Sequence, residues 1–444
     1  MAEIITIGIF LAALCICIIG KVQILYALIF GLFCFTGYSI YEGNSIKVTM
    51  GMLWKGVAKV KTILIVFALI GLLTAVWRAG GTIPFILYHA ISIIQPRIFV
   101  LCTFLLCCVM SFLTGTSFGT ASTMGVICMM LSNSAGLNPL LTGGAVLSGI
   151  FFGDRCSPMS SSAQLVCALT KTDIYENIKG MTKTSIVPLI FTCIFYVFAA
   201  KTGGLNIVDT SSAELFSKSF NLEWITVIPA ILILLLAILH IDVKYAMGIS
   251  ILTGCIICLT IQGFTVSKLI SCLIFGYQAP DNPRLALLLN GGGLVSMFRV
   301  GAIVTISSSY SGIFSQTKLL NGVRSLIQKI SRYITSFGGA VVIAIFFSGI
   351  SCNQTLAVII TEQMSSDLYT DKKELAMVLE NTAIVIAPLI PWSIAGAVPI
   401  TTIGATSGCL IYAVYLYALP IWNFIITLLH TRIDIRDKFI KSSI

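Results

Sequence analysis

Residues 112–120 read FLTGTSFGT, a polar interruption within an otherwise apolar stretch from about residue 98 to 132. Each apolar arm beside it has about 13 to 17 residues, whereas a helix needs roughly 20 to cross the hydrocarbon of a bilayer. Irregular backbone at membrane depth is tolerated only where it is buried in protein or lines a cavity. The stretch therefore predicts a re-entrant helical hairpin, which enters and leaves the membrane on the same side.

The composition of the whole chain indicates a membrane protein. Of its 444 residues, 57% are hydrophobic and 10% are charged, and the mean hydropathy is +1.01. These values exclude a soluble globular enzyme and a disordered chain. The net charge of +10 comes from Lys and Arg dispersed over short loops, which is typical of orientation signals and not of a nucleic-acid site. The fifteen cysteines lie mostly in apolar runs and form no spaced framework.

The apolar runs define the predicted helices. Clear runs cover residues 4–20, 22–40, 62–88, 180–200, 223–240, 245–262, 288–315 and 409–430. Besides 98–132, three further apolar stretches are interrupted by small polar residues or Pro, at about 138–170, 333–365 and 376–408. Segments 41–61 and 264–276 mix apolar and polar residues and are predicted as interfacial helices.

The distribution of charge predicts the orientation. Basic loops near residues 47–61 and 318–332, together with the basic C-terminal tail, belong on the cytoplasmic side, and the acid-balanced connector at 202–222 belongs outside. This assignment requires that 98–132 and 333–365 each return to the side from which they came. The prediction is about ten transmembrane helices plus two re-entrant hairpins, with both termini cytoplasmic.

Two pairs of similar segments indicate an internal repeat. TGTSFG at 114–119 matches SGISCN at 348–353, and SPMS at 157–160 matches IPWS at 390–393, about 234 residues apart in each case. An odd number of spans in each half turns the second half upside down. We therefore predict a first inverted repeat at 1–201, an external connector at 202–222 and a second inverted repeat at 223–444. Inverted repeats with broken helices are typical of secondary transporters, which bind solutes near the bilayer midplane.

The four interruptions carry candidate binding groups. Hydroxyls and free carbonyls at a broken helix can replace the water around a small cation, whereas free N–H groups suit anions. Apart from acidic residues, the predicted substrate and ion ligands are Thr114, Gly115, Thr116, Ser117, Ser157, Ser160, Ser161, Gly349, Ser351, Asn353, Gln354, Asn381, Thr382, Trp392 and Ser393. For any one hydroxyl the alternative is a hydrogen bond back to its own helix. As a set, these residues predict a binding cavity.

Charged residues within apolar stretches are a second kind of candidate. Asp154 and Glu380 are functional candidates because a carboxylate inside a membrane is costly. An ion pair between Asp154 and Arg155 is the structural alternative, and Glu380 is a candidate for coupling protons or cations. Arg78 and Arg299 could meet an anionic substrate, extend toward the interface or pair with Asp154.

Several stretches resemble one transporter family. FLTGTSFGT at 112–120, GDRCSPMS at 153–160 and APLIPW at 387–392, with WRAGGTIP at 77–84, resemble signature stretches of the NhaC family of sodium/proton antiporters. The resemblance runs in order from about residue 62 to 408. It implies a bacterial inner-membrane antiporter with an inverted-repeat fold, Na⁺ and H⁺ as transported ions and no cofactor. Dimers are common in the wider superfamily, so the resemblance leaves a homodimer open.

Two departures from the family pattern leave the substrate open. Ser161 stands where the family typically has Asp, and Asn381 is neutral where the family tends to be acidic. Asp154 and Glu380 then remain to exchange Na⁺ for H⁺. The alternative is a Na⁺- or H⁺-coupled exchanger or symporter of a small organic ion or amino acid.

Two other functional classes are less well supported. Residues 115–119 match the hydrolase pattern GxSxG, but that motif needs a strand–turn–helix context and an activating His, which this helical stretch does not offer. We therefore expect no enzyme and no catalytic residue. A passive channel remains an alternative because channels also use broken helices.

Overall fold

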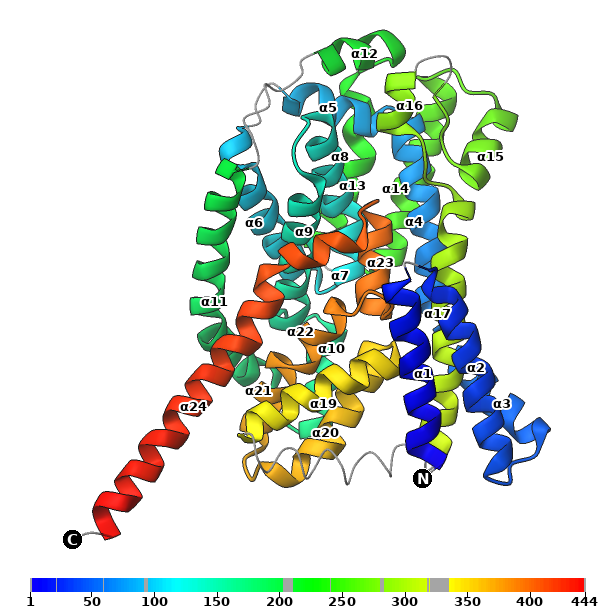
Figure 1. Cartoon of the computed structure of the whole chain (residues 1–444). Coiled ribbons are helices and arrows are strands. Elements are labelled where there is room, and N and C mark those ends of the chain that lie inside the picture. The colour runs from blue at the N-terminus through cyan, green and yellow to red at the C-terminus, as the bar shows by residue number, and fades with distance from the viewer. Residues whose placement is uncertain are drawn as a thin grey trace.

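The computed structural model describes residues 2–20, 22–58, 60–91, 95–202, 211–239, 241–279, 283–317, 319 and 335–442. This part of the chain is helical and contains no strand beyond an isolated bridge between Tyr277 and Gly291 (Figure 1). The connector residues 203–210 and most of the basic loop at 318–332, on which part of the predicted orientation depends, lie outside the described residues.

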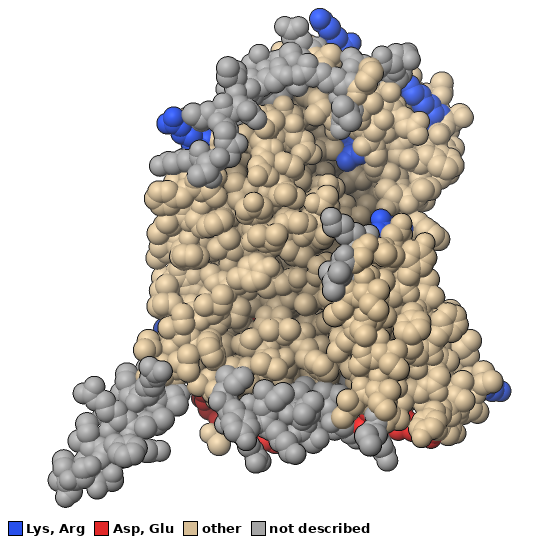
Figure 2. Space-filling model, in the orientation of Figure 1, with Lys and Arg blue, Asp and Glu red and all other residues tan. Residues whose placement is uncertain are grey.

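Long apolar helices agree with a polytopic membrane protein. Five described helices are long and apolar enough to span a bilayer: α2 (Ile24–Tyr41), α4 (Lys61–Ala79), α6 (Pro96–Thr114), α11 (Ile174–Thr202) and α14 (Val243–Thr260). A sixth span arises if Lys372–Leu389 and Ile394–Thr402, bent by 54°, are counted together. Figure 2 shows charged side chains mostly at the two ends of one face and a largely uncharged surface between them. The number of ten spans stays a prediction.

A group of four helices forms one side of the molecule. α1 (Ala2–Ile19), α2, α3 (Ile46–Ala58) and α17 (Leu294–Gln316) pack together around the rings of Phe10, Phe35, Tyr310 and Phe314. At Gly56, α3 comes so close to the backbone carbonyls of α17 that a side chain would not fit. The mixed segment predicted as interfacial therefore packs along α17 in the structure.

The first hairpin is formed by α6, α7 (Ser117–Thr120), a π-helical turn at Ala121–Gly125 and α8 (Val126–Ser134). Gly115 ends α6 with a left-handed φ of 63°, and Thr116 caps α7. α8 returns to α5 (Thr82–Ile91), near the start of α6 (Figure 1). The α6 arm has 19 residues and is longer than predicted.

The second hairpin lies at the opposite end of the molecule (Figure 1). α19 (Ser336–Ser351) ends at Cys352, which has a left-handed φ of 53°, and Asn353 caps α20 (Gln354–Ser365). The φ and ψ angles of Asn353, −140° and 121°, match the −145° and 123° of Thr116. The backbone thus pairs Cys352 with Gly115. The sequence match had paired Gly349 with Gly115, so that match was wrong by three residues.

Two helices are broken in the same way in the two halves. α9 (Pro139–Cys156) and α10 (Ser161–Thr170) are separated by the SPMS segment. α21 (Lys372–Asn381), α22 (Ala383–Ile386) and a 3₁₀ turn at Ala387–Leu389 are separated from α23 (Ile394–Thr402) by the IPWS segment. Ser160 and Ser393 cap the helices that follow, so the SPMS and IPWS segments correspond in their backbone as well.

The remaining helices and turns lie within the helical body and at its ends. They are α12 (Ser211–Ser219), a 3₁₀ turn at Trp224–Val227, α13 (Ile228–Ile238), α15 (Val266–Phe275), α16 (Pro283–Leu289), 3₁₀ turns at Ser366–Leu368 and Ser407–Tyr412, and α24 (Val414–Ser442). α12, α15 and α16 lie at one end, and α24 leaves the helical body toward the other (Figure 1).

Candidate functional site

All four interruptions meet at one cavity of about 220 Å³, which we call the central cavity. The two hairpins, the two broken spans and α4 all contribute to its wall. The lining residues are Thr62, Ile63, Val66, Thr116, Ser117, Phe118, Asp154, Ser161, Ser162, Asn353, Gln354, Thr355, Ile394 and Ala395. Residues from both halves of the sequence therefore line the same space.

Two further cavities adjoin the central cavity. A larger one, of about 500 Å³, is bounded by the tip of the first hairpin and by residues 241–244 at the start of α14, and we call it the outer cavity. A third, of about 240 Å³, extends between α10 and α20. Ser161 lines all three cavities and is therefore part of the wall that they share.

Asp154 is the carboxylate of the central cavity. It lies in the last turn of α9 with only 3% of its surface exposed. Its carboxylate accepts hydrogen bonds from Ser160 Oγ at 3.2 Å and Ser162 Oγ at 3.0 Å, and Ser117 and Gln354 line the same cavity. A carboxylate among hydroxyls is an oxygen-rich set of the kind that hard cations prefer. The described residues contain no cluster of three or more His, Cys, Asp or Glu that could hold a metal ion.

Arg155 points to a different set of groups. Its fully buried guanidinium donates to the Glu380 carbonyl at 3.1 Å, the Met181 carbonyl at 3.2 Å, Thr184 Oγ1 at 2.8 Å and Asn381 Oδ1 at 2.5 Å. Ser185 and Tyr415 accept further hydrogen bonds from it. Among the described residues it forms no ion pair with Asp154, so the predicted Asp154–Arg155 pair is not formed. We call these contacts, which join α9, α11, α21 and α24, the Arg155 network.

Glu380 is buried beside this network. Its surface is 0% exposed, and among the described residues neither carboxyl oxygen has a hydrogen-bond partner. An ionised carboxylate without partners is costly in an apolar environment, unless a proton or a cation accompanies it. The neighbouring Thr382 hydroxyl bonds back to the Val378 carbonyl at 2.7 Å, which is the alternative expected for a helical hydroxyl.

The predicted ligands around the hairpin tips and the SPMS and IPWS segments fall into three groups. Thr114 and Gly115 line the outer cavity. Ser157, Ser351 and Ser393 hydrogen-bond to backbone groups at the turns, and the Gly349 carbonyl accepts from Trp392 Nε1 at 2.8 Å. Thr116, Ser117, Asp154, Ser161, Asn353 and Gln354 are the predicted residues that line the central cavity.

The arginines of the apolar spans lie elsewhere. Arg78 donates to the Asn290 carbonyl at 2.7 Å, and Arg299 is exposed on α17. Neither forms an ion pair with Asp154 among the described residues, so that predicted pairing is not formed.

Some site residues were not predicted. Ser162 could have been noticed as the second hydroxyl of the first turn of α10, whereas nothing local marks Thr62 of α4. Asp242 and Lys244 lie at the wall of the outer cavity and form an ion pair at 3.4 Å.

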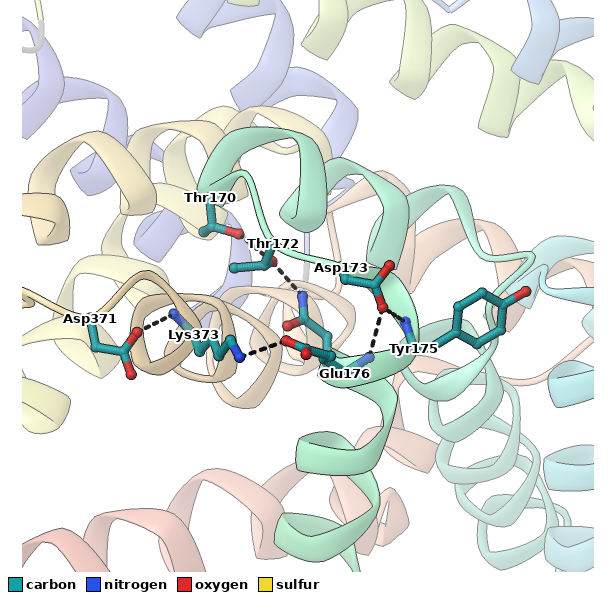
Figure 3. A network of polar contacts seen from close by, with 8 residues as sticks. Thr170, Thr172, Asp173, Tyr175, Glu176, Asp371 and Lys373 are labelled. Carbon is teal, nitrogen blue, oxygen red and sulfur yellow. Dashed lines mark hydrogen bonds and ion pairs between the residues drawn. The ribbon is translucent and has the colours of Figure 1, made fainter.

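A surface contact joins α11 and α21 near the Arg155 network (Figure 3). Lys373 Nζ lies 2.6 Å from Glu176 Oε2, and both side chains are more than half exposed. Asp173 caps α11 by accepting from the Tyr175 and Glu176 N–H groups at 2.9 and 3.1 Å. The exposed Asp173 and Lys373 provide matched controls for the buried Asp154 and Arg155.

Comparisons with known proteins find relatives among antiporters. The model of the Na⁺/H⁺ antiporter family matches residues 2–151 and 149–431. A protein of Alkalihalophilus pseudofirmus named Na(+)/H(+) antiporter NhaC is 28% identical over 352 residues, which cover 76% of this chain and 75% of the relative. The malate-2H(+)/Na(+)-lactate antiporter of Bacillus subtilis is 28% identical over 405 residues, covering 88% and 86%. The arginine/ornithine antiporter ArcD of Halobacterium salinarum is 26% identical over 386 residues, covering 83% and 77%.

Proposed function

The chain belongs to the Na⁺/H⁺ antiporter family, and from this membership we propose that its central cavity is the transport site of a bacterial plasma-membrane antiporter. The observation that carries the proposal is the meeting of four helix interruptions around the buried carboxylate of Asp154. The ions are the Na⁺ and H⁺ of the family. Their passage by alternating access needs a cavity that each side of the membrane can reach in turn.

In the proposed mechanism Asp154 binds either Na⁺ or a proton. The hydroxyls of Ser160 and Ser162, which donate to the carboxylate in the structure, can rotate to direct their lone pairs at a cation. A carboxyl that holds either ion, but not both together, couples the two fluxes. Glu380 is the second proposed carrier of a proton, because no described residue satisfies its oxygens.

The inverted repeat is part of this proposal. The two hairpins lie at opposite ends of the molecule, and their turns share the same backbone conformations (Figure 1). Helix contacts support the same relation: α2 packs on α1 and α17, and α14 packs on α13 and α4. We keep 1–201 and 223–444 as the two repeats, 202–222 as the outside connector and both termini as cytoplasmic.

A second candidate function is favoured by the outer cavity. Its volume of about 500 Å³ is far larger than a bare cation needs, and both residues of the Asp242–Lys244 ion pair line it. Two relatives are named as antiporters of organic ions. The alternative proposal is therefore Na⁺- or H⁺-coupled exchange of a small organic ion or amino acid.

Everted membrane vesicles with a pH-sensitive dye distinguish the two functions. After the vesicle interior has been acidified, added Na⁺ or Li⁺ is expected to restore the fluorescence, because the added cations enter the vesicles in exchange for protons that leave. If neither cation changes the fluorescence, yet the vesicles show counterflow of an organic ion, the result would overturn Na⁺/H⁺ exchange and support the alternative.

The Ser161→Asp variant is expected to exchange Na⁺ with a KM lower by about fivefold, since a new carboxylate in the shared wall of the three cavities attracts the cation. Ser161→Asn is the control, because it adds a side chain of the same size without the charge. The KM for Na⁺ in vesicles is the measurement. Equal KM values for the two variants would show that charge at this position does not tune the site.

The Glu380→Gln variant is expected to fold normally, because a neutral amide costs less than a carboxylate in a place without hydrogen-bond partners. Its proton flux should fall at least about tenfold, since the amide cannot carry a proton, a loss comparable to removing a proton-transfer group. Proton and ²²Na⁺ fluxes measured on the same liposomes check this. Glu362→Gln, at a half-buried position on α20, is the control that should leave both fluxes unchanged. Normal proton flux through Glu380→Gln would remove this residue from the mechanism.

A further inference from the structure

The first arm of the first hairpin packs tightly against the broken span of its own half. A Cβ atom at Gly149 of α9 would lie 2.6 Å from the Phe104 carbonyl oxygen of α6, and one at Gly153 would overlap the backbone of Ser111. Ser111 Oγ also donates a hydrogen bond to the Ile150 carbonyl. Two glycines and one hydroxyl thus hold α6 directly on α9.

The second half lacks this close contact. When the hairpin turns of the two halves are aligned, Ser348 of α19 corresponds to Ser111 of α6. When the SPMS and IPWS segments are aligned, Ile386 of α22 corresponds to Gly153 of α9. Where α9 has a glycine, α22 therefore carries a bulky side chain. Ser348 Oγ is fully buried and has no hydrogen-bond partner among the described residues, although its counterpart has one. An unpaired buried hydroxyl loses the free energy of the hydrogen bond that it could form.

An apolar groove lies beside α19 in this half. It has a volume of about 480 Å³ and separates part of α19 from the 3₁₀ turn after α22 and from α24. Its lining residues include Val341 and Ile345 of α19, Ile386 and Leu389 of the second broken span, and Tyr417 and Ile421 of α24. Ile345 and Ile421 are 50% and 56% exposed, so the groove opens toward the outer surface of the protein.

We propose that α19 has a second position, closer to α22, in which Ser348 donates to the Ala383 carbonyl and the groove narrows. Ala383 is the counterpart of Ile150, which accepts from Ser111 in the first half. Ser348 is thus a positioning residue for transport. The inference rests on the proposed alternating access and identifies the arm that moves.

The tip of the second hairpin provides the pivot for this movement. Trp392 Nε1 donates to the Gly349 carbonyl at 2.8 Å, and Ile394 N–H donates to the Cys352 carbonyl at 2.8 Å. These bonds tie the tip to the IPWS segment while the arm swings. In a transporter built from inverted repeats, the two halves exchange their conformations between the two states of the transport cycle. When α19 moves closer to α22, α6 is therefore expected to move away from α9.

Distances between spin labels at Ile345 and Ile421 test the inference on the full chain in lipid nanodiscs. Noncanonical amino acids carry the labels, so the fifteen native cysteines stay in place. Two distance populations are expected, and added Na⁺ should shift their ratio at constant pH. Ser348→Ala should lower the ratio of the short to the long population by about three- to tenfold, the effect of one hydrogen bond. Ser111→Ala should raise this ratio by a similar factor, because it weakens the opposite state.

A label pair at Ile9 of α1 and Phe33 of α2, both exposed, is the control and should give one constant distance. A single Ile345–Ile421 distance, unchanged by Na⁺ and by both variants, would overturn the second position, and normal Na⁺/H⁺ exchange by the same preparation would leave the proposed function intact. The opposite outcome is a preparation that shows two distance populations that the variants shift, but no Na⁺-driven exchange. This result would support the second position of α19 and contradict the proposed function.

Discussion

The Asp154→Asn variant is expected to retain less than about a thirtieth of the Na⁺-dependent proton exchange, since removing the charge that faces a buried cation costs roughly 2–5 kcal/mol. Asparagine keeps the shape of the side chain, and its one oxygen can accept from one of the Ser160 and Ser162 hydroxyls, which donate to different carboxylate oxygens of Asp154. It removes the negative charge that holds Na⁺ and the group that holds the proton. Dye fluorescence in everted vesicles, at matched protein levels, is the measurement.

Asp173→Asn is the matched control for this experiment. Asp173 caps α11 at an exposed position, and asparagine caps a helix about as well as aspartate. The control variant should therefore exchange Na⁺ at the wild-type rate (Figure 3). If Asp154→Asn also transports normally, Asp154 has no part in the mechanism.

The Arg155→Met variant is expected to lose about 3–5 kcal/mol of stability, because it removes the donor of a buried network and leaves its acceptors unpaired. Methionine has a similar length but no donor for Thr184, Ser185, Asn381 and Tyr415. The contacts between α9 of the first half and α21 and α24 of the second should weaken as a result. The midpoint of thermal unfolding in detergent measures the loss.

Lys373→Ala removes a charge from the surface contact between α11 and α21 and is the control for this variant (Figure 3). Exposed ion pairs contribute about 0–1 kcal/mol, so the midpoint should scarcely change. Equal midpoints for Arg155→Met and the wild type would mean that the network does not hold the two halves together.

The sequence predicted the hairpin tips and Asp154 because the signals are local. Small polar residues and glycine within an apolar run mark a break, and a carboxylate next to a break stands out from its surroundings. The internal match at 348–353 was misplaced because it aligned the two glycines. In the second hairpin the left-handed position belongs to Cys352, whose buried Sγ contacts Tyr310 Oη at 3.2 Å. A glycine therefore marks the end of a helix only where its backbone adopts the left-handed conformation.

The rest of the site depends on packing between distant segments. Thr62 reaches the central cavity because α4 passes behind the hairpin tips, and no local pattern around residue 62 indicates this. The neutral partners of Arg155 come from three helices far away in the sequence, so its neighbour Asp154 was the only partner that spacing could suggest. The length of α6 also escaped prediction, since its apolar run ends only at Thr114.

The buried guanidinium of Arg155 has an electrical consequence. With both carboxyls ionised, Asp154, Glu380 and Arg155 sum to one negative charge. One Na⁺ makes this core neutral, whereas two protons leave it with one positive charge. A cycle that exchanges one Na⁺ for two protons therefore moves net charge, and each charge crossing the bilayer is worth about 2.3 kcal/mol per 100 mV. Membrane voltage, and not the ion gradients alone, then sets how far such a cycle can drive sodium out of the cell.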